Sequence, residues 1–245
     1  MIRALSLSVA TLVTVAGPSD SACRHVDHDG QAYAVCEVHA GEDLRMWLTA
    51  PDGQPVGSFA RLRDLAASEG RKVVFAMNAG MFHPDLSPVG LFVAQGVEES
   101  TLVTAAGPGN FGMRPNGVFC VSGEGFAVME SRAFSAAGRS CDYATQSGPM
   151  LVIDGAFHPR FLADSTSRHI RNGVGVSADE QVAWFAISDA AVTFWEFASL
   201  FRDGLGVPNA LYLDGSISRL YAPELGREDL GFPMGPMVAL LAPEG

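Results

Sequence analysis

Short runs of hydrophobic residues, separated by glycine, proline, asparagine and charged residues, follow one another along most of the chain. Runs of roughly four to eight residues bounded by such turn formers are typical of buried or half-buried strands. The predicted strands are residues 32–38, 44–48, 72–77, 89–93, 117–121, 126–129, 149–153, 174–176, 181–187, 210–213 and 237–241. The pattern therefore predicts a chain that is rich in β-structure.

Two segments instead carry the signals of capped helices. Residues 58–66 begin with a serine cap, and this helix is expected to end near Gly70. Thr193 is followed three residues later by Glu196, which is the capping-box pattern and predicts a helix over 193–201. Few helices among many short strands favour an α+β fold, with a mixed, largely antiparallel sheet core and a few flanking helices.

The first residues have the three-part form of a secretory signal. A short basic start is followed by an apolar stretch over 4–16 and then by small and polar residues up to Ala22. We expect residues 1–22 to be a signal peptide and residues 23–245 to form one domain that is periplasmic or secreted. Cleavage after Ala16 or after Ala22 and a short uncleaved anchor remain alternatives. No other apolar run reaches the length of about 20 residues that spans a bilayer, so no stable membrane insertion is expected after removal of the signal.

Composition narrows the classes of partner. With 245 residues and 48% hydrophobic residues, the chain can bury a substantial core. Its net charge of −11 argues against nucleic-acid or anionic-membrane partners, which need a positive surface. The cysteines Cys23, Cys36, Cys120 and Cys141 suggest two local disulfides, although three pairings are possible. Their scattered positions do not indicate a metal site, and no cofactor is predicted.

The segment Tyr212–Arg219 carries the strongest chemical signal. An apolar strand ends there in Asp214, Gly215, two hydroxyls and an arginine. A carboxylate at a strand end, followed by a glycine that allows close approach of a ligand, indicates the edge of an active site. A satisfied Asx-turn is the alternative. Asn78 ends the apolar run of 73–77 in the same way.

Two arginines and a Ser-Gly pair could hold an anion. Arg168 and Arg171 precede a predicted strand, and a guanidinium suits two-pronged contact with phosphate or carboxylate. The alternative is an ion pair with Asp154, Asp164 or Asp214. Ser147 and Gly148 could offer a hydroxyl and amides to an oxyanion, or they could form a simple turn.

The run Gly107–Gly112 matches the glycine fingerprint of dinucleotide-binding proteins, but Pro115 and an Asn-Gly pair follow where that fingerprint requires a helix. A dinucleotide site is therefore rejected. We expect a tight loop, and the alternative is that its amides line a polar pocket.

Four segments together resemble the phosphodiester glycosidase family, especially its compact bacterial members. They are Asn78–Phe82, Gln146–Val152, Arg171–Gly175 and Leu213–Ser218, in the order found in that family. The resemblance implies that one pocket is surrounded by Asn78, Gly80, Ser147, Gly148, Arg171, Asp214, Gly215 and Ser218. This chain departs from the family pattern at one place in the site. Ser216 and Ile217 stand where animal members have further glycine. The implied activity is that of an exported hydrolase acting on a small molecule or glycan that carries a sugar 1-phosphodiester.

Phosphodiester chemistry assigns roles to some of these residues. The leaving phosphate monoester has a second pKa of about 6, so it needs little protonation. Arg171, assisted by Arg168, is expected to stabilise the phosphate, and Asp214 is expected to stabilise the oxocarbenium-like sugar. Asn78 is expected to orient sugar hydroxyls. The second carboxylate of a glycosidase is left open among Asp85, Asp154 and Glu98.

Two other functions remain alternatives. A non-catalytic envelope protein that binds phosphosugars would share the arginines but would not need Asp214 for turnover. A serine hydrolase using Ser147 is disfavoured, because the glycine that a nucleophile elbow has two residues earlier is missing.

Overall fold

A computed structural model describes residues 22–214 and 216–244. The predicted signal peptide lies outside this part of the chain except for Ala22, and so does Gly215. No helix among the described residues is long and apolar enough to cross a membrane.

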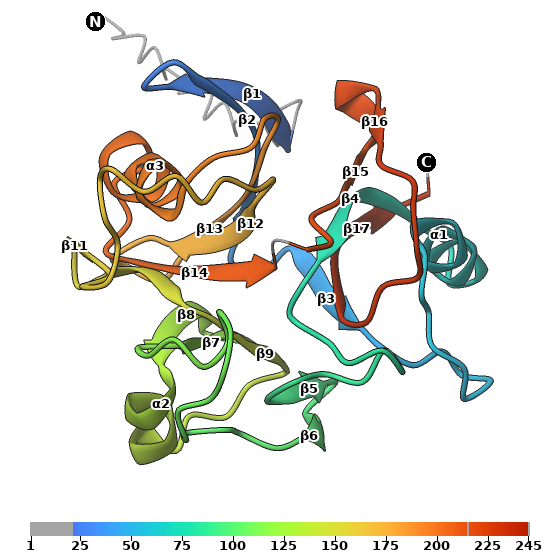
Figure 1. Cartoon of the computed structure of the whole chain (residues 1–245). Helices are drawn as coiled ribbons and strands as arrows, with labels where there is room; N and C mark the ends of the chain where they lie inside the picture. The colour runs from blue at the N-terminus through green and yellow to red at the C-terminus, as the bar shows by residue number, and fades with distance from the viewer. Residues whose placement is uncertain (1–21, 215, 245) are drawn as a thin grey trace, which may run out of the picture.

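Three β-sheets make up the fold (Figure 1). The first contains, in spatial order, β1 (Cys23–His28), β2 (Gln31–His39), β13 (Val182–Ser188), β12 (Asn172–Val176), β14 (Asn209–Asp214), β10 (Met150–Ile153) and β11 (Ala156–Phe157). The second contains β16 (Arg227–Glu228), β15 (Leu220–Ala222), β4 (Arg71–Asn78), β17 (Met237–Pro243) and β3 (Asp43–Trp47). The third contains β6 (Val97–Ser100), β5 (Phe92–Ala94), β9 (Tyr143–Ser147), β7 (Gly117–Ser122) and β8 (Gly125–Glu130). The pairs of named strands in the described chain are antiparallel.

The outer face of each sheet packs against one helix. The helix α1 (Phe59–Ser68) covers the second sheet, α2 (Ser131–Ala137) covers the third, and α3 (Phe194–Ser199) covers the first. Because both faces of the central strands are buried, these strands have hydrophobic residues at successive positions rather than at alternate ones. In β2, for example, Tyr33 and Val35 pack on the helix side, whereas Ala34 and Cys36 face the interior.

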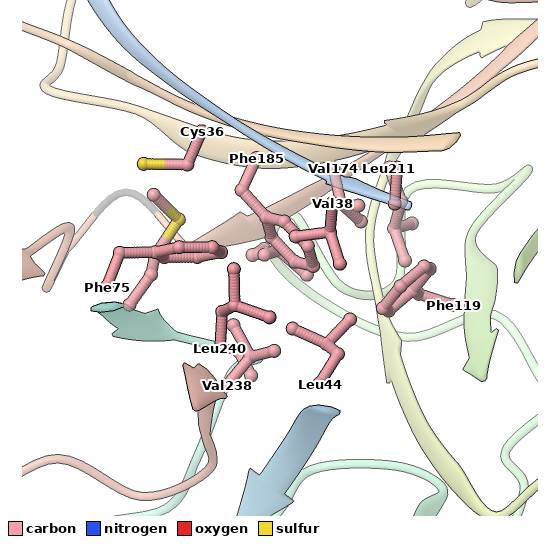
Figure 2. Packing of buried hydrophobic residues seen from close by; sticks show 14 of the residues in the cluster. Cys36, Val38, Leu44, Phe75, Phe119, Val174, Phe185, Leu211, Val238 and Leu240 are labelled. Carbon is pink, nitrogen blue, oxygen red and sulfur yellow. The ribbon is translucent and has the colours of Figure 1, made fainter. Parts of the chain in front are cut away.

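The inner faces of the three sheets meet in one core (Figure 2). Phe185 of the first sheet lies 5.6 Å from Phe75 of the second and 5.5 Å from Phe119 of the third, measured between ring centroids. All three rings are fully buried. Aromatic pairs at such separations stabilise packing beyond the area that they bury, so Phe185 ties the three sheets together.

The predicted α+β class with a largely antiparallel core is confirmed. Most predicted strands are found within one or two residues of their expected ends. Elements that the pattern did not predict include α2, β6, β9 and β15. The helix expected over 193–201 begins at its capping box but changes to a π-helical turn over Leu200–Gly204, and the segment 89–93 becomes a strand only at Phe92.

The disulfides pair locally. Cys23 is bonded to Cys36 across the β1–β2 hairpin, and Cys120 is bonded to Cys141 next to β9. Of the three possible pairings, this is the one that the neighbouring positions suggested. Such bonds persist in oxidising compartments, so they are compatible with an extracellular location.

Candidate active site

Polar side chains converge where β4, β9, β12 and β14 approach one another. We call Asn78, Ser147, Asn172, Asp214 and Ser218 the polar centre. Asn78, Ser147 and Asn172 are fully buried, and Asp214 is 7% exposed. In Figure 1 the arrow of β14 ends beside the second sheet, to which β4 belongs. The polar centre therefore lies at a junction of sheets, and not at a shared edge of parallel strands.

Asn172 connects the members of the polar centre. Its Nδ2 donates to the backbone carbonyl of Asn78 at 2.8 Å, and the two side-chain amides are 3.2 Å apart. Its Oδ1 accepts from the backbone N–H of Asp214 at 3.1 Å and from Ser218 Oγ at 3.2 Å. This one amide thus fixes the second sheet against the end of β14. Buried polar groups that are satisfied in this way rigidify a site.

A bulge in the β12–β14 ladder brings Asp214 to this position. Asn172 is opposite Asp214, but the next residue, Gly173, is opposite Tyr212, so Leu213 is the extra residue. Leu213 packs into the inner core and Tyr212 into the cluster under α3. Asp214 Oδ1 accepts from the backbone N–H of Ser216 at 2.9 Å, so the Asx-turn considered from the sequence is present as well.

Ser147, Gly80 and Gly148 allow backbone segments of the site to pack closely together. Ser147 Oγ donates to the carbonyl of Leu213 at 2.7 Å, which ties β9 to β14. A Cβ atom on Gly148 would lie 2.6 Å from the Cβ of Asn116, and one on Gly80 would lie 2.7 Å from Thr145 Oγ1. Both glycines are therefore required by close approach of neighbouring chain segments.

Arg171 is buried on the opposite side of the same strand end. It is 1% exposed, its Nε donates to the carbonyl of Val192 at 2.9 Å, and its Nη2 donates to the carbonyl of Ser167 at 3.1 Å. Its guanidinium carbon lies 3.6 Å from the ring centroid of Phe194 and 5.4 Å from that of Tyr212. Burial lowers the pKa of Arg171, and the nearby Tyr212 opposes this effect.

Two buried polar atoms near Asp214 have no hydrogen-bond partner in the described chain. They are Arg171 Nη1 and Tyr212 Oη. Burial raises the pKa of Tyr212 to about 12, while the Arg171 charge opposes the rise and the Asp214 charge adds to it. Tyr212 is therefore close enough to each of the two charged groups to interact with it electrostatically. A buried donor without a partner is uncommon and is often associated with a functional role.

The remaining predicted residues lie around this arrangement or away from it. Arg168 is bound to Glu196 at 2.6 Å, so its partner is not one of the aspartates considered from the sequence. Asp85 is exposed and bonded to Ser87, which lowers the pKa of its carboxyl. Glu98 and Asp154 are exposed as well, and no hydrogen bond joins them or Asp85 to the polar centre within the part of the chain that the structure describes.

Sequence reasoning missed Asn172 and Tyr212 as site residues. An asparagine that opens a strand before two glycines is unusual, because asparagine is depleted in strands, and this signal could have identified Asn172. Tyr212 was read as part of a buried apolar strand, and nothing in its pattern indicates an unsatisfied hydroxyl. Among the described residues, no group of three or more His, Cys, Asp or Glu side chains could hold a metal ion.

Comparison with known proteins relates this arrangement to a family. The profile of the phosphodiester glycosidase family matches residues 71–228, which include the whole polar centre. A protein of Escherichia coli K12, described as uncharacterized protein YigE, is 35% identical over 217 residues, covering 89% of this chain and 83% of that protein. The chain belongs to the phosphodiester glycosidase family.

Solved structures agree with the fold of this phosphodiester glycosidase family member. The catalytic domain of zebrafish N-acetylglucosamine-1-phosphodiester alpha-N-acetylglucosaminidase, auto-inhibited by its pro-peptide, has a TM-score of 0.57 at 14% identity, covering 89% of this chain and 81% of that one. A hypothetical protein from Synechocystis has a TM-score of 0.56 at 16% identity over 90% of this chain, which spans 61% of that longer protein. At these identities the likeness concerns the fold alone.

Proposed function

We propose that the chain is an exported glycosidase that hydrolyses a sugar 1-phosphodiester of the N-acetylglucosamine type, or a related glycan, in the periplasm or outside the cell. Membership of the phosphodiester glycosidase family supports the reaction class. The two disulfides support an oxidising compartment.

One observation carries the assignment of the site. Asp214 is fixed at a sheet junction two residues after Tyr212, and Tyr212 Oη and Arg171 Nη1 are buried without a hydrogen-bond partner in the described chain. A carboxylate together with unused donors matches a substrate that develops positive charge on the sugar and negative charge on the leaving phosphate. These are the charges that arise when a sugar 1-phosphodiester is cleaved.

The reaction breaks the bond between the anomeric carbon and the phosphate oxygen. The electron pair leaves with the phosphate monoester, and water supplies a hydroxyl group to the anomeric carbon and a proton to the solvent. Asp214 stabilises the oxocarbenium-like sugar, and Arg171, through Nη1, stabilises the departing phosphate. Because that phosphate has a second pKa of about 6, it leaves without a strong general acid.

The other predicted residues hold these groups in place. Asn78 and Ser147 use their side chains on protein partners, so we assign them, with Gly80, Gly148 and Ser218, to positioning rather than to direct contact with the sugar. Arg168 fixes Glu196, which caps α3, the helix that carries Phe194 beneath Arg171. A nucleophilic role for Ser147 has no support, because its hydroxyl donates to a carbonyl and not to a base.

The decisive experiment is hydrolysis of a synthetic N-acetylglucosamine 1-phosphodiester by the mature protein and by Asp214→Asn. The isosteric amide keeps the fold but removes the negative charge, so kcat should fall by about 10³-fold or more while substrate affinity is retained. Asp27→Asn is the matched control, because Asp27 is exposed on the edge strand β1. Binding without turnover by the unaltered protein would support the non-catalytic phosphosugar-binding alternative instead.

A further inference from the structure

A cavity of about 430 Å³ is lined by three arginines. We call Arg114, Arg132 and Arg160, with the cavity between them, the arginine pocket. Its other lining residues are Ala106, Gly112, Pro115 and Glu130. A cavity of this size is within the range that binds small ligands.

The three arginines differ from most others in this acidic chain. Nine of the fourteen described arginines have a carboxylate within 4.0 Å, but Arg114, Arg132 and Arg160 have none in the described chain. Among the described arginines, only Arg171 and Arg219 share this condition. Three of the five described arginines without an ion pair therefore line one cavity.

The acid in the lining, Glu130, forms no ion pair with these arginines within the described chain. Glu130 Oε2 accepts from the backbone N–H groups of Arg132 and Ala133 at 2.8 and 2.9 Å and so caps α2. That carboxylate is therefore bonded to backbone amides, and the guanidinium groups of Arg132 and Arg160 donate to no acceptor among the described residues. In a protein with a net charge of −11, a pocket lined by three arginines and one carboxylate is a local exception.

Hydrogen bonds between side chains and the backbone fix the walls of the pocket. Arg114 Nη1 donates to the carbonyl of Thr104 at 3.3 Å, and the N–H of Arg160 donates to Nδ1 of the buried His158 at 3.2 Å. Gly112 belongs to the glycine run recognised in the sequence, and a Cβ there would lie 1.9 Å from the carbonyl oxygen of Gly107. The run is thus a tight loop, as expected from the sequence, and its Gly112 contributes to one wall.

Two backbone hydrogen bonds connect the pocket to the end of β14. The carbonyl of Pro115, in the pocket lining, accepts from Met150 at 2.9 Å, and the carbonyl of Pro149 accepts from Tyr212 at 3.1 Å. With neighbouring strands about 4.8 Å apart, the pocket wall lies on the order of 10 Å from Tyr212. The pocket wall and the strand that ends in Asp214 are therefore joined through one intervening segment, residues 149–150.

We propose that the arginine pocket is a subsite for a phosphate-type anion on the leaving part of the substrate, beyond the phosphodiester that is cleaved. The proposal rests on the proposed function and specifies its substrate class as a sugar 1-phosphodiester whose leaving alcohol carries a second negative group. Guanidinium groups suit this ligand because they form two-pronged, charge-assisted bonds to phosphate oxygens.

Binding of inorganic phosphate, measured by calorimetry, tests the pocket without requiring turnover. Each of Arg114→Gln, Arg132→Gln and Arg160→Gln should weaken binding by roughly tenfold, which corresponds to one charge-assisted hydrogen bond. The matched control is Arg24→Gln, which removes the same charge from β1, at the opposite edge of the first sheet from β11. Equal affinity in the unaltered protein and in the triple variant would overturn the subsite, and unchanged far-UV circular dichroism would show that the variants are folded.

Turnover of two synthetic diesters tests the substrate class. The first has a neutral leaving alcohol, and the second has the same alcohol with an added phosphate. The unaltered protein should show a KM roughly tenfold lower for the second, and Arg132→Gln should remove most of that preference without changing kcat. Equal KM values for both diesters would refute the assigned substrate class. If neither diester is cleaved, the proposed function fails, while phosphate binding still decides whether the pocket is an anion site.

Discussion

The polar centre and the arginine pocket differ in the kinds of side chain from which they are built. Asn78, Ser147 and Asn172 are short, neutral and fully buried; Asn78 and Asn172 are bonded to each other, and Ser147 is bonded to the carbonyl of Leu213. Arg114, Arg132 and Arg160 are long, charged, at least partly exposed and without ion pairs. A short side chain that is fully bonded loses little further freedom when a substrate arrives, whereas an exposed arginine remains adaptable and hydrated.

This difference separates two tasks. Groups that act on a transition state must be fixed before the reaction begins, because preorganised dipoles need no rearrangement. Groups that only hold a distant part of the ligand can order themselves on binding, at a cost in affinity but not in the chemical step. The comparison therefore predicts that changes in the polar centre affect stability and kcat, and that changes in the pocket affect KM.

The strongest test of the comparison is Asn172→Ala. This change leaves the carbonyl of Asn78 and the N–H of Asp214 buried without their side-chain partner, so the free energy of unfolding should fall by about 4 kcal/mol. Urea denaturation measures the loss, and kcat should fall as well because Asp214 is no longer fixed.

The same strand offers a matched control for this substitution. Asn209 lies at the other end of β14 and accepts one hydrogen bond from the backbone of Asp154 at an exposed turn. Asn209→Ala should therefore cost less than about 1 kcal/mol. Similar losses in the two variants would mean that the polar centre contributes no more to stability than an ordinary turn.

Acid pH should distinguish the two regions next. Apart from Asp214, the side chains of the polar centre do not titrate, whereas the wall of the arginine pocket rests on His158, whose pKa burial lowers from 6.5 to about 4. Below pH 6.5 the unfolded chain binds a proton that the folded chain does not. Stability is therefore complete above pH 6.5 and declines as the pH falls to about 4, by roughly 3 kcal/mol from this one group.

His158→Asn isolates that contribution, since Asn keeps an acceptor for the N–H of Arg160 but does not titrate. Between pH 7 and pH 4 the unaltered protein should lose roughly 3 kcal/mol more unfolding free energy than the variant. Carboxylates that titrate in the same range affect both proteins alike. Parallel stability curves for the two proteins would show that His158 is not held neutral by burial.

Salt should have the smallest effect of these tests, and that effect should be confined to substrate binding. Screening at 0.5 M NaCl shortens the reach of exposed charges to roughly 4 Å, so KM for the doubly charged diester should rise by about fivefold relative to 0.05 M. Because Asp214 and Arg171 are buried, kcat should hardly change. Steady-state kinetics at both salt concentrations give the two constants separately, and a salt effect on kcat alone would reverse the comparison.

Much of the fold could be predicted from local patterns. The hydrophobic runs indicate most strands, and the cap residues Ser58 and Thr193 mark the starts of α1 and α3. The helix α2 was missed because its cap is Glu130, an uncommon cap residue. Strand order could not be read at all, because it depends on which distant runs pair, and a single sequence does not record that.

The candidate site could be predicted only where a residue type is unusual in its place. Asp214 and Asn78 stand out because polar side chains end apolar strands. The connecting role of Asn172 was not visible, since its partner Asn78 is 94 residues away and the bulge that aligns it with Asp214 is a property of strand pairing. Arg114, Arg132 and Arg160 come from a loop, a helix start and the segment after β11, so no local pattern groups them.

The position of β17 has a consequence for dividing this chain into parts. The residues that match the family profile end at Glu228, yet β17 lies between β4 and β3, and the N–H of Ala79 donates to the carbonyl of Pro236 at 2.8 Å. Asn78 itself is opposite Met237. A polypeptide shortened to residues 71–228 would leave β4 with an open edge directly beside the polar centre. The boundary of sequence similarity and the boundary of the folding unit are therefore different, and a strand beyond the matched residues completes the sheet beside the site.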